Sequence, residues 1–260
     1  MTNSIIHPNA KIGQNVIISP FCIIEEDVII GDGTWIGPHV TINNGVRIGK
    51  NCRFFPGAIV GSVPQDLKFA GEQSTLEIGD NVTIREYCTL NRGTAANEKT
   101  VIGDHALLMA YVHVAHDCVI GERVILANNV NLAGHITIGN QTVLGGLTAV
   151  HQFVKIGPHV MIGGGSLVRK DVPPFVRAGR EPLSYNGVNT VGLKRRGFTP
   201  EQILNIQDIY RILYVKGNNV TKAVQIIEQT MPDTPEKTLI LDFIKGATRG
   251  IMRGLNTIQF

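Results

Sequence analysis

The sequence predicts a parallel β-solenoid followed by a small α-helical domain. Apolar residues recur at every sixth position over most of the chain as far as Val168, and glycine is abundant, with 29 residues among 260. From residue 199 onwards the apolar spacing becomes that of amphipathic helices. Together these three observations indicate a long regular scaffold with a helical end.

The six-residue period defines the scaffold. It runs through positions 6 to 60, 78 to 90 and 102 to 168 in a single phase, and all 25 positions are aliphatic except Phe54. Such a period fits neither a helix of 3.6 residues per turn nor a simple alternating strand. It fits a solenoid of short strands separated by corners. Three hexads then close one coil, and neighbouring coils lie about 4.8 Å apart.

Small residues occupy a second position of the repeat, two residues before the aliphatic one. All four cysteines fall there, namely Cys22, Cys52, Cys88 and Cys118. We therefore expect buried, reduced cysteines that fill the core, rather than disulfide partners or nucleophiles. Glycine often follows the aliphatic residue, where it relieves the backbone at a tight corner.

The repeat is interrupted at residues 61–77 and 91–101. Because the phase is the same on both sides of each interruption, these segments are predicted to be loops that project from a continuous prism. After Val168 a proline-rich segment ends the repeat, and Thr199, Pro200 and Gln202 form the capping-box pattern of a first helix. The predicted division is a β-helix over residues 1–190 and a helical domain over residues 191–260.

Charge and hydropathy argue against a membrane-spanning protein. No apolar run approaches the roughly 20 residues of a transmembrane helix, and the N-terminus lacks a basic region followed by an apolar one. We therefore expect a cytoplasmic protein without stable membrane insertion. Residues 1–168 carry 10 basic and 13 acidic residues, whereas residues 169–260 carry 14 and 8. The basic C-terminal third indicates an acidic partner, an anionic ligand, or simply a solvated surface.

Histidines gather at one edge of the predicted prism. Positions three hexads apart lie above one another, so His116 lies below Gly134, and Gly134 lies below Gln152. His135 and His151 are each one residue from this line. A neutral imidazole is the usual base near pH 7. Histidines that converge across a subunit boundary can instead bind zinc, and histidines scattered over the exterior need no shared role.

Eight motifs, in order along the chain, resemble those of a known family. They are VPQDLKFAGE, NRGT, HVAHDC, ILANN, LAGH, AVHQF, DVPPF and GLKRRGF, between residues 63 and 198. Their order is similar to that of the UDP-N-acetylglucosamine 3-O-acyltransferases, hexapeptide-repeat enzymes that carry out the first acylation of lipid A synthesis. The resemblance implies a left-handed parallel β-helix, although the general rule for crossover connections favours the right hand. It also implies transfer of a 3-hydroxyacyl group from acyl carrier protein to the sugar 3-hydroxyl, without a metal or another cofactor.

The resemblance also implies roles for individual residues. His116 is implied to be the general base, Asp117 its orienting neighbour, and the backbone N–H of Gly134 the oxyanion donor. Pairing of His116 with Asp117 requires a corner in the chain, because neighbours on a strand point to opposite faces. Residues implied to position the substrates are Gln65, Asp66, Lys68, His113, His135, His151, Gln152, Asn189, Arg195 and Arg196. Met161 and Gly164 are implied to line an acyl-chain groove, which the glycine leaves open for a long chain.

Several alternatives stay open at this point. Val191 stands where the family pattern has glutamate, which removes one polar contact from the implied nucleotide site. The sister N-acyltransferase uses the same scaffold and a histidine base but normally has a separate N-terminal domain, whereas here the repeat begins at Ile6. A metal-dependent lyase and a non-catalytic β-helical spacer are further alternatives. Because family members are trimers, we expect a homotrimer, with no nucleic-acid partner.

Overall fold

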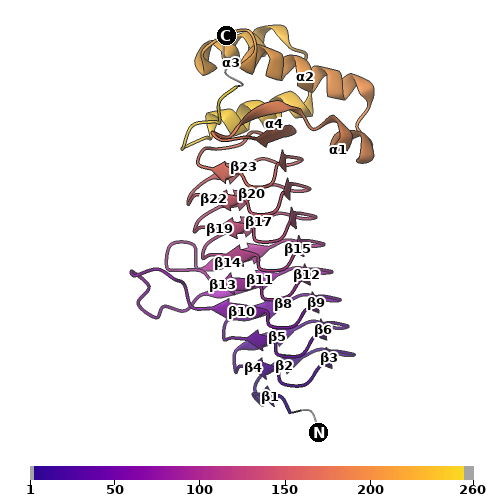
Figure 1. Cartoon of the computed structure of the whole chain (residues 1–260), viewed down its shortest axis with the longest axis vertical. Helices are drawn as coiled ribbons and strands as arrows, with labels where there is room; N and C mark the ends of the chain where they lie inside the picture. The colour runs from indigo at the N-terminus through magenta and orange to yellow at the C-terminus, as the bar shows by residue number, and fades with distance from the viewer. Residues whose placement is uncertain (1–2, 255–260) are drawn as a thin grey trace.

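The structure, a computed structural model, describes residues 3–254 and is a long three-sided prism with a helical end (Figure 1). Each side is a sheet of very short strands, and the chain forms the predicted left-handed parallel β-helix. Residues 1–2 and 255–260, which belong to the two predicted domains, lie outside the described residues. Within residues 3–254, no helix has the length and apolarity needed to cross a membrane.

Within residues 3–254, three sheets of nine, eight and ten strands form the faces of the prism. The first face contains β1 (Ile5–Ile6), β4 (Ile23–Ile24), β7 (Thr41–Ile42), β10 (Ile59–Ser62), β13 (Thr89–Asn91), β16 (His113–Val114), β19 (Asn131–Leu132), β22 (Ala149–Val150) and β25 (Leu167–Val168). The second contains β2 (Lys11–Ile12), β5 (Val28–Ile30), β8 (Val46–Ile48), β11 (Thr75–Ile78), β14 (Lys99–Ile102), β17 (Val119–Ile120), β20 (Thr137–Ile138) and β23 (Lys155–Ile156). The third contains β3 (Ile17–Ile18), β6 (Trp35–Ile36), β9 (Arg53–Phe54), β12 (Thr83–Ile84), β15 (Leu107–Leu108), β18 (Ile125–Leu126), β21 (Val143–Leu144), β24 (Met161–Ile162), β26 (Val176–Gly179) and β27 (Ser184–Val188).

Strands of successive coils pair in parallel at an offset of three hexads, as His113 of β16 does with Asn131 of β19. The offset grows to five hexads between β8 and β11, where Arg47 pairs with Glu77. It is four hexads between β13 and β16, where Thr89 pairs with His113. Each projecting loop therefore adds a whole number of hexads to its coil. This explains why the phase of the repeat survives the two loops, residues 63–74 and 92–98, which project on the same side of the prism (Figure 1).

The hexad side chains fill the prism. The four cysteines are buried and free, as predicted. In the first coil Ile6 and Ile12 are 40% and 38% exposed, whereas their equivalents in the next coil, Ile24 and Ile30, are each 1% exposed. A fully buried isoleucine contributes roughly 2 kcal/mol relative to an exposed one, so stacking of the coils is the main source of stability.

In the described part of the chain, four helices cover the C-terminal end of the prism: α1 (Thr190–Arg195), α2 (Pro200–Tyr214), α3 (Val220–Thr230) and α4 (Pro235–Lys245) (Figure 1). The predicted capping box is present at α2, where Thr199 and Gln202 each accept the other's backbone N–H. Tyr210 of α2 is fully buried and donates its hydroxyl to the carbonyl of Pro174 at 2.6 Å. The apolar core continues from the prism into α2 and α4, so the helices are seated on the last coils.

Three edges join the faces of the prism. The first edge follows the strands of the first face and includes residues 115–117 and 133–135 on successive coils. The second edge follows the second face, as at residues 157–159, and the third edge follows the third face, as at residues 163–165. Many side chains on these edges point away from the apolar core, so the edges are where polar groups can be presented.

Candidate active site

His116 and Asp117 form a hydrogen-bonded pair on the first edge. Nδ1 of His116 lies 2.7 Å from Oδ2 of Asp117. The chain turns here between β16 and β17, and Asp117 has a φ of +59°. A corner allows two consecutive side chains to meet, whereas a strand would send them to opposite faces. The left-handed conformation is uncommon for residues other than glycine, but aspartate is among those that adopt it most readily.

The second projecting loop holds Asp117 in place. The carboxylate of Asp117 accepts the N–H of Thr94 at 3.0 Å and the hydroxyl of Thr94 at 2.7 Å. The N–H of Asp117 donates to Oγ1 of Thr100 at 2.8 Å. The side chain of Asp117 is completely buried. Burial alone would raise its pKa, but the hydrogen bonds from Thr94 and His116 outweigh burial and hold the pKa below its ordinary value.

The ionised carboxylate selects one form of the imidazole. A carboxylate can only accept hydrogen bonds, so Nδ1 of His116 carries the proton in the bond to Asp117. In the neutral ring this leaves Nε2 with a free lone pair. His116 is therefore oriented as a base with its acceptor nitrogen directed away from Asp117.

Gly134 lies directly above the imidazole of His116. A Cβ atom on Gly134 would be 2.6 Å from Cε1 and 2.7 Å from Nε2 of that ring, so only glycine leaves room for it. On either side the N–H of Ala133 donates to Val150 and that of His135 donates to His116. Within residues 3–254, by contrast, the N–H of Gly134 makes no hydrogen bond to a protein acceptor. A free backbone donor therefore lies close to Nε2.

His135 continues the cluster one coil above Asp117. Its Nδ1 lies 3.8 Å from Oδ2 of Asp117, and its ring packs edge-on against that of His116 with centroids 5.0 Å apart. On its other side the ring stacks on Phe153 at 4.5 Å. Burial is the largest influence on His135 and lowers its pKa, although the charges of Asp117 and Asp66 act in the opposite direction. His135 is therefore neutral at pH 7.

The other predicted residues of the first edge lie on the same coils as the pair or just above it. His113 is half-buried in β16, with Nδ1 2.7 Å from Oγ1 of Thr89. Burial lowers the pKa of His113 as well. His151 and Gln152 are exposed at the corner after β22. The first edge therefore presents several hydrogen-bonding side chains around His116.

The first projecting loop reaches this edge through one residue. Asp66 is half-buried and close enough to influence His135 electrostatically. Its carboxylate also accepts the N–H of Lys68 at 3.0 Å, which shapes the loop tip. Gln65 and the side chain of Lys68 are exposed. Asp66 thus acts on His135 through its charge, and within residues 3–254 the loop makes no hydrogen bond to His116 or Asp117.

The residues predicted for nucleotide recognition belong to α1 or flank it, and two of them contact the second edge. Asn189 is buried as the cap of α1 and donates its amide to the carbonyl of His159 at 2.9 Å. Arg196 donates to the carbonyl of Gln141 at 2.7 Å. Both side chains thus fix α1 to the prism. Arg195, by contrast, is exposed.

The residues predicted for the acyl-chain groove lie on or beside the third edge. Met161 lines an open hollow of about 530 Å³ together with Gly163, Arg177 and Arg180. Gly164 is exposed at the corner next to this hollow, and a Cβ there would be 3.0 Å from the carbonyl of Gly146. A single chain thus brings together the predicted residues around His116. The predicted residues of α1 and of the acyl-chain groove lie elsewhere on the prism.

The cluster also has a possible set of metal ligands. His116, Asp117 and His135 each offer one ligand atom, and these atoms all lie within 4.8 Å of one another. However, Oδ2 of Asp117 already accepts hydrogen bonds from the hydroxyl of Thr94 and from Nδ1 of His116. A metal ion bound at this oxygen would compete with both bonds, so the donor arrangement fits an oriented base better than a ligand set.

Two residues of the cluster were missed by sequence reasoning. Thr94 belongs to the NRGT motif, but nothing in the motif shows that its hydroxyl reaches Asp117 across the loop. Phe153 lies exactly one coil after His135 in the repeat, so the stacking rule that placed Gln152 above Gly134 also predicts this contact. Nothing in the sequence predicts the contact of Thr94 with Asp117, whereas the repeat does predict the contact of Phe153 with His135.

Known proteins are similar to the chain over nearly its whole length. Residues 171–252 match the family described as Udp N-acetylglucosamine O-acyltransferase, Domain 2, and residues 27–62 and 99–134 match bacterial transferase hexapeptide repeats. The chain is 45% identical over 251 residues to the acyl-(acyl-carrier-protein)–UDP-N-acetylglucosamine O-acyltransferase of Thermodesulfovibrio yellowstonii, covering 96% of this chain and 97% of that one. It is 63% identical over 193 residues to the enzyme of the same name from Chlorobaculum tepidum, covering 74% and 73%.

The fold agrees with solved structures of such enzymes. The UDP-N-acetylglucosamine acyltransferase from Bacteroides fragilis superimposes with a TM-score of 0.95 and 49% identity, covering 96% of this chain and 98% of that one. The corresponding enzyme from Acinetobacter baumannii gives a TM-score of 0.94 and 43% identity, covering 97% and 99%. The chain therefore belongs to the acyl-(acyl-carrier-protein)–UDP-N-acetylglucosamine O-acyltransferase family.

Proposed function

We propose that this chain transfers a 3-hydroxyacyl group from acyl carrier protein to the 3-hydroxyl of UDP-N-acetylglucosamine, the first step of lipid A biosynthesis, with His116 as general base. The names of the relatives supply the donor and the acceptor. The observation that carries the proposal is the buried Asp117 carboxylate, which orients the imidazole of His116 beneath the free N–H of Gly134.

The reaction needs a base, and it needs a donor for the negative charge of the intermediate. Nε2 of His116 takes the proton of the sugar 3-hydroxyl while its oxygen attacks the thioester carbon, and Asp117 stabilises the imidazolium that forms. The N–H of Gly134 donates to the oxyanion of the tetrahedral intermediate, which is worth about 3 kcal/mol. Collapse of the intermediate breaks the C–S bond, and the imidazolium returns its proton to the departing thiolate.

The surrounding polar residues are assigned to substrate contacts. Neutral histidines can both donate and accept hydrogen bonds, which suits the hydroxyls and the diphosphate of a sugar nucleotide. We assign this role to His113, His135, His151 and Gln152 on the first edge, and to Gln65, Asp66 and Lys68 on the first projecting loop. These contacts place the 3-hydroxyl at Nε2 of His116, and positioning of this kind can supply several kcal/mol of the rate enhancement.

A second copy of the chain completes the site in this proposal. Arg195 is exposed on α1, a helix whose flanking residues Asn189 and Arg196 bind the second edge rather than the first, so in this proposal it reaches the substrate of a neighbouring prism. Three copies that pack edge to edge close a ring with three equivalent sites, so we propose a homotrimer. Asn189 and Arg196 support the nucleotide site indirectly, by holding α1.

Two further features bear on the substrates. Val191 is 57% exposed on α1, so the glutamate expected there would have served a ligand rather than the prism. Gly164 is exposed and directly follows Gly163, which lines the hollow beside Met161; we propose that the lack of a side chain there favours a long acyl chain. The excess of basic residues after residue 168 matches an acidic carrier protein and would increase its association rate.

Acyl transfer to UDP-N-acetylglucosamine, measured with a 3-hydroxyacyl carrier protein, tests the proposal. His116→Ala should lower kcat roughly 1,000-fold at an unchanged melting temperature. His105→Ala is the matched control, because His105 is an exposed histidine on the second edge. A His116→Ala enzyme that kept most of its activity would overturn the base assignment.

The same assay separates the alternatives. Transfer that survives a chelator would exclude the metal-dependent lyase, and absence of transfer by the wild type would favour a non-catalytic spacer. Parallel reactions with UDP-N-acetylglucosamine and its 3-amino analogue define the acceptor. Reactions with donors of different acyl chain length show which length the groove accepts.

A further inference from the structure

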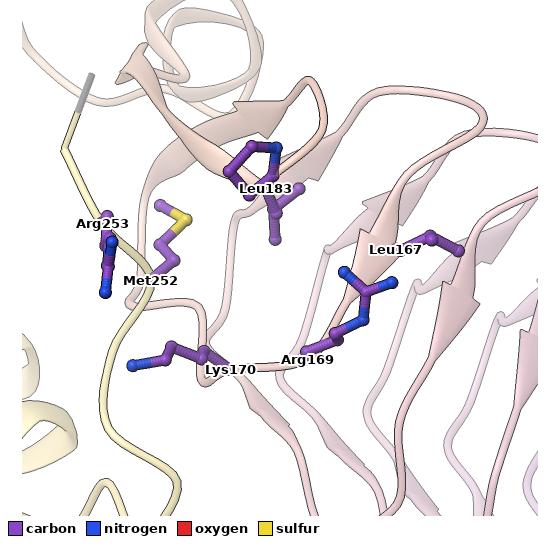
Figure 2. A pocket seen from close by; sticks show the side chains of 7 residues that line it. Leu167, Arg169, Lys170, Leu183, Met252 and Arg253 are labelled. Atoms are coloured by element: carbon purple, nitrogen blue, oxygen red, sulfur yellow. The ribbon is translucent and has the colours of Figure 1, made fainter. Parts of the chain in front are cut away.

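A cationic hollow lies at the end of β25, the last strand of the first face, and Figure 2 shows the side chains that line it. It has a volume of about 210 Å³ and is lined by Leu167, Arg169, Lys170, Pro182, Leu183, Met252 and Arg253. Arg169 and Lys170 directly follow β25, while Arg253 comes from the C-terminal segment, which bridges to Ser184. The hollow therefore combines an apolar lining with three cations from two separate segments.

The cations of the hollow are only partly neutralised. Arg169 pairs with Glu181 at 2.8 Å, and both side chains are exposed. Within residues 3–254, Lys170 and Arg253 have no carboxylate within 4.0 Å. The neighbouring Asp171 is buried and accepts the backbone N–H groups of Lys155 and Arg249 instead. The hollow is thus a site of positive potential that suits an anion.

The hollow and the proposed base lie on the same edge of one prism. Strands β16, β19, β22 and β25 are consecutive neighbours in the first face. His116 lies two residues after the end of β16, and Lys170 lies two residues after the end of β25. Three steps between strands, at about 4.8 Å each, separate the two positions by about 14 Å along the prism axis.

We propose that this hollow binds the phosphodiester of the phosphopantetheine arm of the acyl carrier protein. The proposal rests on the proposed function, in which the sulfur of that arm carries the acyl group to His116. The arm has about thirteen bonds from sulfur to phosphorus, and an extended chain advances about 3.5 Å for every three backbone bonds, so it spans roughly 15 Å. The phosphate can therefore reach Lys170 and Arg253 while the thioester is at His116.

The chemistry of the arm also matches the lining of the hollow. Lysine and arginine form strong, charge-assisted hydrogen bonds to phosphate oxygens, which suits Lys170 and Arg253. Next to the phosphate the arm carries a carbon with two methyl groups. Leu167, which is 38% exposed, and the exposed Pro182 provide an apolar surface for these methyl groups within the same hollow (Figure 2). An inorganic anion would use the cations but not this apolar surface.

Two minimal donors test the proposal, the 3-hydroxyacyl thioesters of 4′-phosphopantetheine and of pantetheine, which differ only in the phosphate. For the wild type we expect kcat/KM with the phosphorylated donor to be at least tenfold higher. Lys170→Gln and Arg253→Gln should each lower the ratio of the two kcat/KM values about tenfold. Lys222→Gln is the matched control, because it removes one charge from exposed α3, outside the hollow.

Each other outcome has a definite meaning. An equal loss with both donors in the Lys170 and Arg253 variants would show a structural role and overturn the proposal. A loss that appears only with the intact carrier protein would indicate a contact with the carrier surface, which also overturns it. Equal kcat/KM values of the wild type for the two donors would also overturn the proposal. Failure of the proposed function looks different, because the wild type would then transfer the acyl group from neither donor.

Discussion

Replacement of Gly134 by alanine tests whether the ring of His116 must lie where the structure places it. The new Cβ would be 2.6 Å from Cε1 of His116, and ordinary contact begins at 3.4 Å, so the ring must move by about 0.8 Å. The φ of Gly134 lies outside the left-handed region, so alanine adds no backbone strain. A displacement of about 1 Å at a reacting group costs roughly 100-fold in rate. We therefore expect kcat for acyl transfer to fall about 100-fold.

Steady-state kinetics and thermal unfolding separate this effect from a loss of fold. Alanine restricts the unfolded chain and so stabilises by about 0.4–1 kcal/mol at a compatible position, which offsets part of the clash. The melting temperature of Gly134→Ala should therefore change by only a few degrees. Gly103→Ala provides the contrast, because its Cβ would be 2.7 Å from the backbone of Gly121, which cannot rotate away. There we expect a lower melting temperature with kcat retained. Wild-type kcat in Gly134→Ala would refute the assigned position of the ring.

Three further predictions concern groups around the site. Asp117→Asn presents an amide that does not select the reactive tautomer of the imidazole, so kcat should fall at least 100-fold. Because the folded-state pKa of Asp117 is lowered, its carboxylate contributes stability above about pH 4 that is lost as the pH falls further, and the difference in melting temperature from Asp117→Asn should shrink there. Burial, and secondarily Arg196, lower the pKa of His159 to about 4, so the wild type should lose stability as the pH falls from 6.5 towards 4, whereas His159→Phe should lose less. Arg195→Gln should raise the KM for the nucleotide sugar at constant melting temperature, whereas Arg196→Gln, which breaks the bond to the carbonyl of Gln141, should lower the melting temperature.

Each of these predictions has a contrary result. A melting-temperature difference for Asp117→Asn that stays constant down to pH 3 would mean that the carboxylate is not held as an anion. Parallel pH–stability curves for the wild type and His159→Phe would place the acid-sensitive group elsewhere. A nucleotide KM that rises with Arg196→Gln at an unchanged melting temperature would show that Arg196, not Arg195, meets the substrate.

The prism was predictable because the hexad is itself a packing rule. Each aliphatic hexad residue points into a core shared by all coils, so the sequence pattern and the buried positions coincide, as at Ile24 and Ile30. The same rule placed the cysteines and aligned His116 with Gly134. It also predicts contacts between neighbouring coils, such as that between His135 and Phe153.

Contacts made by irregular segments were not predictable in this way. Thr94 reaches Asp117 only because of the path of the second loop, which no repeat dictates. Asn189 and Arg196 carry the residue types of a nucleotide site, yet their side chains are bound to the carbonyls of His159 and Gln141. Residue type reveals which hydrogen bonds a group can make, whereas only the fold reveals which of them are already made.

At the corner that holds the candidate base, one position has a non-glycine residue with positive φ and the position before it requires glycine. Asp117, His135 and Phe153 occupy equivalent positions on three coils and all have positive φ, between +59° and +66°. A left-handed conformation costs about 1–2 kcal/mol for a residue other than glycine, and glycine would avoid that cost. At Asp117, however, glycine would remove the carboxylate that orients His116. One position earlier in the repeat the requirement is reversed, because the ring of His116 fills the space that a side chain on Gly134 would need. The corner therefore accepts backbone strain where a functional group must be placed, and uses glycine where that group needs room.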